Sequence, residues 1–471
     1  MLAQTNHLIT ATILHCDVVQ DDAHYSKRAP LGTALGYNGG HWSLYIRYLS
    51  LLQNSQPLDL EEALIRLYER LPQVETYVNV KLSDALGAIV AKDIIAPGNL
   101  PPFRASAMDG YAIIKKDFED APESQFSVIG ASLAGHPFTG EVNSGECVRI
   151  FTGAKVPQGA DQVILQEQCL TRHDSTGSQS NQSAVTFKPH QPAETYLRPI
   201  GHDVKQGQPL AKKGDQLDGF LLGALAASGI AEVCVFKKPT VGVFSTGDEL
   251  VDPGTPLAAL RDGQIYDSNR FTVINLLRHS PCTLIDLGRL PDDAKAVENA
   301  FMAASKRCQI LITSGGVSVG DADFITATLK SLGKLDFWRL NLKPGKPLAF
   351  GQIHNCYVFG LPGNPVSTIV TLLLLAKPAI WHCAGARAVP RLRLPARLRS
   401  PLEHTPGRAE FQRGTLDEQE GLLHVTVTGD QSSNRLSTFK GANCLIEIPK
   451  TAGNLPAGAT VWVSPFTGLL S

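Results

Sequence analysis

Hydrophobic and polar residues follow different patterns in successive parts of the chain. Between Leu58 and Leu71 the apolar residues recur at positions 60, 64, 67 and 71, a spacing that predicts an amphipathic helix. From about 78 to 206, short apolar runs alternate with clusters of Gly, Pro and Asp, which is typical of a β-rich module. A pattern of strands and turns returns after residue 389. The sequence therefore predicts two β-rich parts on either side of a different central segment.

Strand-like and helical segments alternate in that central segment, between 239 and about 388. Runs such as VGVFST at 241–246 and QILITSG at 309–315 predict strands, and helices are expected near 268–279, 294–307, 322–332 and 365–377. Such alternation predicts a mostly parallel sheet whose two faces are covered by helices. In sheets of this kind ligands bind beyond the carboxyl ends of the strands.

These patterns divide the chain into five predicted parts. They are an N-terminal extension of unknown role (1–57), a discontinuous linker domain (58–77 and 207–238, with a helix at Leu217–Ser228), a β-rich second domain (78–206), an α/β domain (239–388) and a C-terminal β domain (389–471). The polar insert Thr171–Ser183 is expected to form a surface loop. The apolar run Val366–Ala376 stops at Lys377, and since a membrane span needs ~20 residues, we expect a core helix.

Composition and charge disfavour several classes of function. The chain has 471 residues, enough for several domains, and a formal net charge of -1. Without a basic excess, we expect no binding to nucleic acid and no binding to a membrane. The nine cysteines are odd in number and form no Cys-x-x-Cys pair, which argues against a zinc site or a disulfide framework. Thiols in apolar runs and the absence of an export-signal pattern predict a cytoplasmic protein.

Four polar motifs directly follow predicted strands of the α/β segment: STGDEL (245–250), GRLPDD (288–293), SGGVSVGDAD (314–323) and GLPGNP (360–365). Because the carboxyl ends of parallel strands share one edge, we expect these motifs to converge on one rim. Gly315, Gly316 and Gly320 allow a tight turn whose backbone amides can approach a phosphate. One glycine-rich turn is common in α/β proteins, but four such turns favour an anion-binding site.

Acidic residues gather at the same predicted rim, so a phosphate ligand would require cations there. Glu249, Asp292 and Asp323 each close a strand-end motif, whereas Asp267 and Asp321 are equally well explained as helix caps or solvated residues. Mg²⁺ binds one or two carboxylates together with phosphate oxygens. Further positive charge comes from side chains that follow the glycine turn: Arg339, Lys343 and Lys346. KPGKP lacks P-loop spacing and no GxGxxG opens a βαβ unit, which disfavours NTPases and dinucleotide dehydrogenases.

Two further groups of polar residues lie outside the α/β segment. SAMDGYA places Asp109, and FTGAKVP places Thr152, in turns of the β-rich region. EFQRG and TGDQSSN in the last domain present Arg413 and Ser433, which can hold an oxyanion by charge and hydrogen bonds. Taken alone, Met-Asp-Gly-Tyr is an ordinary turn, a threonine before glycine is usually a local cap, and isolated residues such as Arg413 and Ser433 are more often surface features.

The motifs read in order resemble one known family. SAMDGYA, FTGAKVP, RPIGHD, FSTGDEL, GQIYDSNR, SGGVSVGDAD, KPGKP, GLPGNP and EFQRG are similar to the molybdopterin molybdenumtransferases, often called MoeA, to which the E domain of gephyrin is related. The resemblance runs from about residue 59 to the end. It implies a multidomain α/β plus β fold, with an elongated linker domain, a β-rich second domain, a central molybdopterin-binding-type α/β domain and a C-terminal β-barrel-like domain. It also implies a homodimer whose active cleft is shared between subunits.

The resemblance also implies roles for residues at the matching motif positions. The catalytic set is Asp109, Thr152, Glu249, Asp292, Asp323, Arg339 and Lys343, and the Mg²⁺ ligands come from Glu249, Asp292 and Asp323. The substrate-binding set is Asp203, Gly315, Gly316, Ser318, Gly320, Lys346, Pro362, Gly363, Asn364, Arg413 and Ser433. Position 339 is arginine where several relatives have lysine, which keeps the charge but changes its shape.

The implied reaction inserts molybdate into adenylated molybdopterin and releases AMP, and it needs no protein nucleophile. A pterin adenylyltransferase is an implied partner. Three alternatives stay open. A competence-damage-type nucleotide amidase or pyrophosphatase shares the α/β domain but lacks SAMDGYA, and a pterin adenylyltransferase needs only the α/β segment. A non-catalytic scaffold would not need the complete set of acids and bases, and a molybdate-dependent turnover assay separates it from an enzyme.

Overall fold

The computed structural model describes residues 57–173, 183–189, 194–317 and 324–470. Apart from Pro57, the predicted N-terminal extension lies outside the described residues. The predicted site residues Ser318, Gly320 and Asp323, and the alternative acid Asp321, also lie outside them.

The α/β domain is built on a six-stranded sheet with the order β16-β13-β17-β21-β20-β18. Four strands run parallel: β16 (Thr283–Leu290), β13 (Thr240–Thr246), β17 (Ile310–Ser314) and β21 (Cys356–Leu361). β20 (Pro347–Ile353) pairs antiparallel with β21, and β18 (Lys334–Arg339) pairs antiparallel with β20. The predicted mostly parallel sheet is therefore confirmed.

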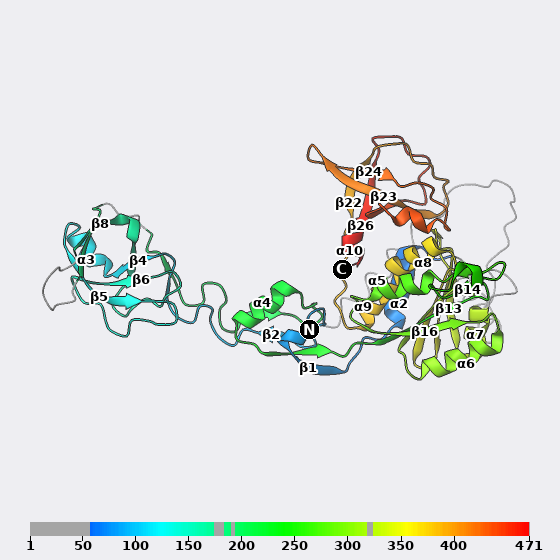
Figure 1. Ribbon diagram of the computed structural model, residues 1–471, viewed down its shortest axis with the longest axis horizontal. Coiled ribbons are helices and arrows are strands. Elements are labelled where there is room, and N and C mark those ends of the chain that lie inside the picture. Colours follow the sequence, from blue (N-terminus) through cyan, green and yellow to red (C-terminus); the bar gives the residue numbers. More distant parts are fainter. Residues whose placement is uncertain (1–56, 174–182, 190–193, 318–323, 471) are drawn as a thin grey trace, which may run out of the picture. The chain divides into compact units, whose positions relative to one another are not determined.

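Helices cover both faces of this sheet, because successive strand residues point to opposite sides. Val241 and Val243 of β13 lie in a core with α5 (Asn269–Leu277) and α8 (Pro365–Thr371). Phe244 lies in a second core with α6 (Ala294–Ser305) and α7 (Phe324–Leu332). Figure 1 shows α6 and α7 on one side of β13 and β16, and α5 and α8 on the other.

A continuous apolar helix runs through the first of these cores. α8 continues as a π-helical turn, Leu372–Ala376, and then as α9 (Lys377–Cys383). By length and composition Pro365–Cys383 could cross a membrane, but 83% of its apolar window is buried inside the protein. The expected core helix is confirmed. It does not end at Lys377, because the buried ammonium group donates a hydrogen bond to the carbonyl oxygen of Leu469 at 2.6 Å.

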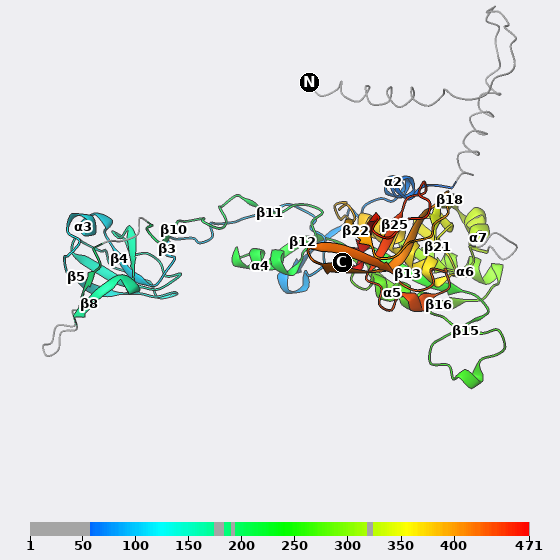
Figure 2. The same ribbon diagram turned by 90° about the horizontal axis from the view of Figure 1, so that it is seen from above.

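The predicted first helix is α2 (Leu60–Arg70), and it packs on the α/β domain. Leu60 and Leu67 belong to the core that contains α8, and Arg70 Nη2 donates to Asp336 Oδ1 at 2.7 Å. Figure 2 shows α2 beside β18. This position differs from the expected place in the linker domain, because an amphipathic stripe reveals a buried face but not the partner of that face.

Two strand pairs join the segment before the β-rich module to the segment after it, the two parts of the predicted linker domain. β1 (Tyr77–Lys81) pairs with β12 (Glu232–Phe236), and β2 (Ile94–Ile95) pairs with β11 (Pro209–Ala211). A 3₁₀ turn, Leu82–Asp84, follows β1. The hydrophobic core of this linker region joins residues 85–90 to α4 (Gly219–Ala227). This helix matches the one predicted near 217–228. The strand pairings therefore place residues 78–95 in the linker domain instead of the β-rich module.

Six strands form the main sheet of the β-rich module, in the order β7-β4-β6-β5-β9-β8. Their bounds are β4 (Gly110–Ile113), β5 (Phe126–Ser132), β6 (Glu146–Ile150), β7 (Gln162–Leu165), β8 (Cys169–His173) and β9 (Ser183–Phe187). The short strands β3 (Ala105–Ser106) and β10 (Leu197–Arg198) pair separately, and α3 (Lys115–Asp120) follows β4. β8 and β9 include the two ends of the insert predicted as a loop at 171–183, and the rest of that insert lies outside the described residues.

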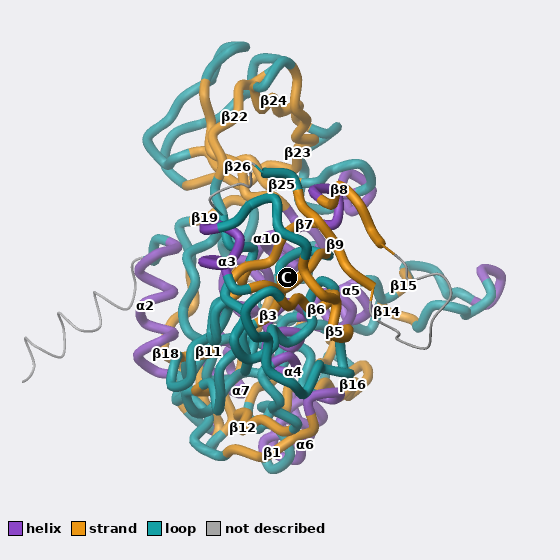
Figure 3. Tube along the Cα trace, turned by 90° about the vertical axis from the view of Figure 1, so that its left-hand side faces the viewer, coloured by secondary structure: helices purple, strands orange, loops and turns teal. Residues whose placement is uncertain are grey.

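The C-terminal strands close into a barrel-like sheet in the order β19-β23-β24-β22-β26-β25, with β23 also paired to β25. Their bounds are β22 (Leu394–Leu398), β23 (Ala409–Gln419), β24 (Leu422–Val427), β25 (Cys444–Ile448) and β26 (Thr460–Pro465), followed by α10 (Phe466–Leu470). Figure 3 shows these strands as one group. β19 (Leu342–Lys343), from the predicted α/β segment, pairs in parallel with the start of β23. The β23–β25 pairing closes the sheet and confirms the barrel-like expectation, and the β19–β23 pairing joins this domain to the α/β domain.

Candidate functional site

The four strand-end motifs lie on neighbouring strands, as the sequence predicts. Ser314 at the end of β17 is in register with Ser245 of β13 and with Leu361 of β21, and Thr246 is in register with Leu290. Because these strands are parallel, the residues that follow them leave the sheet at the same edge. Backbone and side-chain contacts then join the motifs to one another.

An acidic corner, which we define as Asp248, Glu249 and Asp292, forms where β13 and β16 end. The Asp248 amide donates to Asp292 Oδ2 at 3.3 Å, and the Asp292 amide donates to Asp248 Oδ1 at 3.2 Å. The Glu249 side chain folds back, so that a Cβ added at Gly247 would lie 2.3 Å from its Oε2. All three carboxylates are exposed. Sequence reasoning missed Asp248, although it precedes Glu249 in the same motif and could have been found by its adjacency.

The glycine turn after β17 has the tight geometry that the sequence predicts. Gly315 and Gly316 have φ values of 91° and 67°, in the left-handed region that favours glycine. A Cβ added at Gly315 would lie 2.7 Å from the backbone oxygen of Thr246. Only glycine therefore allows the turn to approach the end of β13 this closely. The predicted anion-binding role of Ser318 and Gly320 stays a prediction.

The LPGNP turn contacts the glycine turn on its other side. A Cβ added at Gly363 would lie 3.6 Å from the Cα atom of Gly315. Asn269 Nδ2 donates to the Gly363 carbonyl oxygen at 2.7 Å, and the hydroxyl of Thr368 donates to the Pro362 carbonyl oxygen at 2.5 Å. Asn364 is the N-cap residue of α8. Asn269 belongs to GQIYDSNR, so this motif joins the same rim.

A buried ion-pair cluster supports the rim from below. Asp267 is 0% exposed and accepts hydrogen bonds from Ser245 Oγ at 2.6 Å and from Arg270 Nε at 3.0 Å. The guanidinium of Arg270 also donates to Asp286 at 2.7 Å and contacts Asp252. Asp267 therefore has a structural role beneath STGDEL, which favours the explanation that does not assign it to catalysis.

Two predicted residues of the C-terminal domain have different environments. The Ser433 carbonyl oxygen accepts a hydrogen bond from the Val366 amide at 3.1 Å, which brings TGDQSSN to the start of α8. Arg413 is 0% exposed, and its guanidinium donates to the carbonyl oxygens of Asp430, Gln431 and Ser432. This burial disagrees with the expected direct contact between Arg413 and an oxyanion, because the donors already satisfy backbone carbonyls. Arg413 can act on a ligand only through the loop that it holds.

The three predicted basic residues, Arg339, Lys343 and Lys346, have different surroundings. Lys343 Nζ lies 3.1 Å from Glu410 Oε2, and its side chain is 49% exposed. The KPGKP turn packs on α8, since a Cβ added at Gly345 would lie 2.6 Å from Thr371 Cγ2. Lys346 is exposed, and Arg339 is half-buried at the end of β18. The charge of Lys343 is thus balanced by Glu410 of the C-terminal domain.

Asp109 and Thr152 form one unit in the β-rich module. Asp109 Oδ1 accepts hydrogen bonds from the Thr152 amide at 2.7 Å and from its hydroxyl at 2.8 Å. These two bonds, with a smaller contribution from Arg149, hold the pKa of Asp109 below its ordinary value. Asp109 is therefore a carboxylate that accepts hydrogen bonds at neutral pH. Asp203 is exposed at the end of the module, where its amide donates to the Leu100 carbonyl oxygen at 2.9 Å.

Three family models match the chain in succession. The MoeA N-terminal region (domain I and II) matches residues 58–229, the probable molybdopterin binding domain matches 242–382, and the MoeA C-terminal region (domain IV) matches 395–466. A molybdopterin molybdenumtransferase of Haemophilus influenzae is 43% identical over 88% of this chain and 100% of its own length. The chain belongs to the MoeA family.

Other relatives extend this family match. A molybdopterin molybdenumtransferase of Bacillus subtilis is 32% identical over 88% of this chain and 95% of its own length. Gephyrin of Dictyostelium discoideum is 33% identical over 87% of this chain, which spans 62% of that protein. A solved MoeA structure from Pyrococcus horikoshii is 27% identical, with a TM-score of 0.72 over 87% of this chain and 100% of that one. The similarity therefore covers all the domains that contain predicted site residues.

The acidic corner of this MoeA chain offers carboxylate oxygens as metal ligands. Hard oxygen donors fit Mg²⁺, which takes one or two carboxylates together with phosphate oxygens and water. Within the part of the chain that the structure describes, no three acidic, histidine or cysteine side chains are already gathered as a metal site. The corner fits an ion whose coordination is completed by a phosphate ligand.

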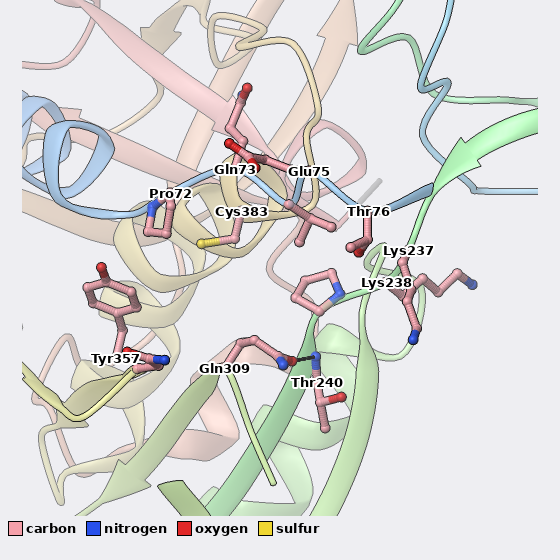
Figure 4. Close-up of a pocket in the computed structure, with 13 residues that line it drawn as sticks. Pro72, Gln73, Glu75, Thr76, Lys237, Lys238, Thr240, Gln309, Tyr357 and Cys383 are labelled. Atoms are coloured by element: carbon pink, nitrogen blue, oxygen red, sulfur yellow. Dashed lines mark hydrogen bonds between the residues drawn. The ribbon is translucent and has the colours of Figure 1, made fainter. Parts of the chain in front are cut away.

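A cavity of ≈ 400 Å³ lies at the opposite end of the parallel strands of this MoeA chain (Figure 4). Thr240, Gln309 and Tyr357 line it near the amino ends of β13, β17 and β21, and the Thr240 amide donates to Gln309 Oε1 at 2.7 Å. Cys383 also lines it, and burial raises the pKa of this thiol to about 12. A neutral thiol is a poor nucleophile, and the cavity lining contains none of the predicted site residues.

Proposed function

We propose that this chain inserts molybdate into adenylated molybdopterin and releases AMP, as a molybdopterin molybdenumtransferase. The relatives that carry this name match it over nearly their whole length, which supports the transferase class over the amidase, adenylyltransferase and scaffold alternatives. The structural observation that supports the proposal most is that STGDEL contacts GRLPDD through Asp248 and the glycine turn through Thr246, while LPGNP contacts the glycine turn, all at one rim. A pyrophosphate ligand needs both close backbone approach and cations at such a site.

The proposed binding of substrate follows from these contacts. The phosphates lie against the backbone of Gly315, Gly316 and Gly363, where the absence of side chains leaves the amides accessible. Glu249 and Asp292, assisted by Asp248, hold Mg²⁺, which when bound neutralises phosphate charge and stabilises the leaving group. Asp323 is expected to assist them.

The other charged residues orient substrate and product in this proposal. Lys343 offers an exposed ammonium group whose remaining N–H donors can bind a phosphate or molybdate oxygen. Because its pKa is lowered, Asp109 stays ionised and orients donors such as water or a pterin amine, while Thr152 fixes its carboxylate. No protein nucleophile is needed, since water cleaves the phosphoanhydride to give AMP and the pterin phosphate, while molybdate is transferred to the dithiolene sulfurs.

A homodimer is the second part of the proposal, and α4 supports it. Its sequence GFLLGALAA is apolar throughout. Leu225 is buried, but Phe220 is 91% exposed. An exposed apolar helix with small residues suits close packing against a second copy. In such a dimer Asp109 of one subunit would serve the rim of the other. We also propose a pterin adenylyltransferase as supplier of the adenylated substrate, and a cytoplasmic location, which the free and mostly buried cysteines support.

Release of AMP from adenylated molybdopterin on addition of molybdate tests the proposed function. We expect Glu249→Ala and Asp292→Ala each to lower turnover at least tenfold, with partial recovery at high Mg²⁺. Glu298→Ala on α6 is the matched control, because it removes a carboxylate of the same domain away from the strand ends. Unchanged turnover in both rim variants would contradict the metal assignment, and no molybdate-dependent release by the parent protein would contradict the function.

A further inference from the structure

Glu410, the first residue of EFQRG, is a buried carboxylate in direct contact with Lys343. Its side chain is 3% exposed, and its Oε2 accepts a hydrogen bond from Lys343 Nζ at 3.1 Å. The two residues are also in register between β23 and β19. A buried carboxylate is costly unless it is paired and hydrogen-bonded. The pair therefore constrains the lysine far more than an ion pair on the surface would.

His404 closes the other side of the Glu410 carboxylate. Its side chain is 1% exposed, and its Nε2 lies 3.7 Å from Glu410 Oε2. The ring nitrogens lie 2.9 Å from the Ala452 carbonyl oxygen and 3.1 Å from the Arg408 carbonyl oxygen. These contacts anchor the ring between two backbone segments, so it forms a fixed wall behind the carboxylate.

The backbone that leads to Lys343 is held independently of Glu410. The Asn341 amide donates to the Leu58 carbonyl oxygen at 2.7 Å, and Asn341 Nδ2 donates to Asp59 Oδ1 at 3.0 Å. Lys450 Nζ donates to the other oxygen of Asp59 at 2.5 Å. With the backbone fixed in this way, Glu410 decides where the flexible end of the Lys343 side chain lies.

We infer that Glu410 is a positioning residue of the substrate site, which acts by holding the ammonium group of Lys343 where it can donate to an oxyanion. The inference rests on the proposed function, in which Lys343 touches substrate. An ammonium group has three N–H donors, so a bond to Glu410 leaves others for an anion, and the side chain is half exposed. EFQRG thus serves the site through Glu410 directly, whereas Arg413 acts on a neighbouring loop.

The loss of this contact has a distinct kinetic signature. Glu410→Gln removes one negative charge beside Lys343, so the site becomes more positive and the KM for an anionic substrate should not rise. The freed ammonium group is misplaced in the transition state, and kcat should fall about tenfold. A merely structural loss would lower the amount of active protein, and therefore the apparent kcat, to the same extent whether or not Lys343 is present. In a Lys343→Met background, Glu410→Gln should lower kcat less than twofold, because the lysine it positions is absent.

Acylation of Lys343 by a water-soluble N-hydroxysuccinimide ester tests the contact without any activity. The extent of modification is measured by peptide mass spectrometry relative to Lys346, three residues away on the same turn. We expect Glu410→Gln to raise the Lys343 to Lys346 ratio severalfold. The matched control is Glu447→Gln, which removes another buried carboxylate of this sheet that pairs with Arg391 and Arg393. That variant should leave the ratio unchanged.

The outcomes separate the inference from the function on which it rests. An unchanged ratio in Glu410→Gln, or equal kcat losses in the parent and Lys343→Met backgrounds, would overturn the positioning role. Full turnover of Lys343→Met would instead overturn the assignment of Lys343 to the site. If Glu410→Gln does not fold, Glu410→Asp keeps the charge but shortens the side chain, and the same acylation ratio should rise with it.

Discussion

Replacement of Arg270 by methionine should strongly destabilise the α/β domain. Its guanidinium is 7% exposed and pairs with Asp267, which is 0% exposed, while Asp252 at its outer end is 63% exposed. Arg270→Met would leave Asp267 with hydrogen bonds from the Ser245 hydroxyl and one backbone amide but without a positive partner. Removal of one member of a buried ion pair costs about 3–5 kcal/mol, because the remaining charge is buried and uncompensated.

Urea unfolding of the parent and variant proteins measures this loss. The matched control is Asp252→Asn, which cuts the exposed end of the same guanidinium and should cost less than about 1 kcal/mol. The double variant Asp267→Asn with Arg270→Met should be more stable than Arg270→Met alone, since no buried charge is left unpaired. A loss below about 1 kcal/mol for Arg270→Met would refute the reasoning that this buried cluster supports the rim.

Three further predictions follow from individual positions. Lys377→Met removes a buried ammonium group. Burial lowers the pKa of Lys377 from 10.5 to about 8, so between these pH values the folded parent protein binds fewer protons than its unfolded chain. Urea unfolding should show the stability of the parent rising relative to the variant by about 3 kcal/mol from pH 8 to about 10.5; a flat difference would contradict this. Gly315→Ala should cost about 1–3 kcal/mol and lower AMP release, whereas Gly254→Ala, with a similar positive φ but open space, should cost less; equal losses would exclude the close approach. Thr152→Val removes a hydrogen bond that lowers the pKa of Asp109, so an NMR titration of that carboxyl should move upward, and an unmoved titration would reject the contact.

Strand-end chemistry could be predicted from the sequence because it depends on local order. A buried strand followed by STGDEL or GLPGNP places those residues beyond a carboxyl end, and parallel strands share that edge. The contacts of Asp248 with Asp292, and of Gly363 with Gly315, confirm this convergence. The choice of Glu249 over Asp248 could not be made in this way, because both residues follow the same strand.

Packing partners could not be predicted, because hydrophobic periodicity indicates which face of a helix is buried but not which part of the protein covers it. The stripe of α2 is buried as expected, but against the α/β domain instead of the linker. Lys377 within an apolar run indicated a helix end, yet the helix continues because the Leu469 carbonyl oxygen accepts its buried ammonium hydrogen. That acceptor comes from a segment 92 residues away, and no local pattern announces it.

The role of a charged residue likewise depends on acceptors that are distant in sequence. Arg413 has the donors that an oxyanion requires, but a loop at 430–432 presents three carbonyl oxygens to the same donors. Glu410, three positions earlier on β23, was not indicated because glutamate at the start of a strand is usually exposed. Only the pairing of β19 with β23 reveals that its partner is Lys343.

The helix that begins with α8 contacts both the C-terminal domain and the turn that carries Lys343. Near its start, the Val366 amide donates to the Ser433 carbonyl oxygen of the C-terminal domain at 3.1 Å. At the last residue of α8, Thr371 lies against the KPGKP turn, since a Cβ added at Gly345 would lie 2.6 Å from its Cγ2. A chain that contained the α/β segment alone would keep the acidic corner but would lose Glu410 and the sheet that receives β19. A reaction that requires both a metal held by the acidic corner and a positioned lysine therefore needs the C-terminal domain. This is a physical reason to prefer a transferase that uses the whole chain over an activity of the α/β domain by itself.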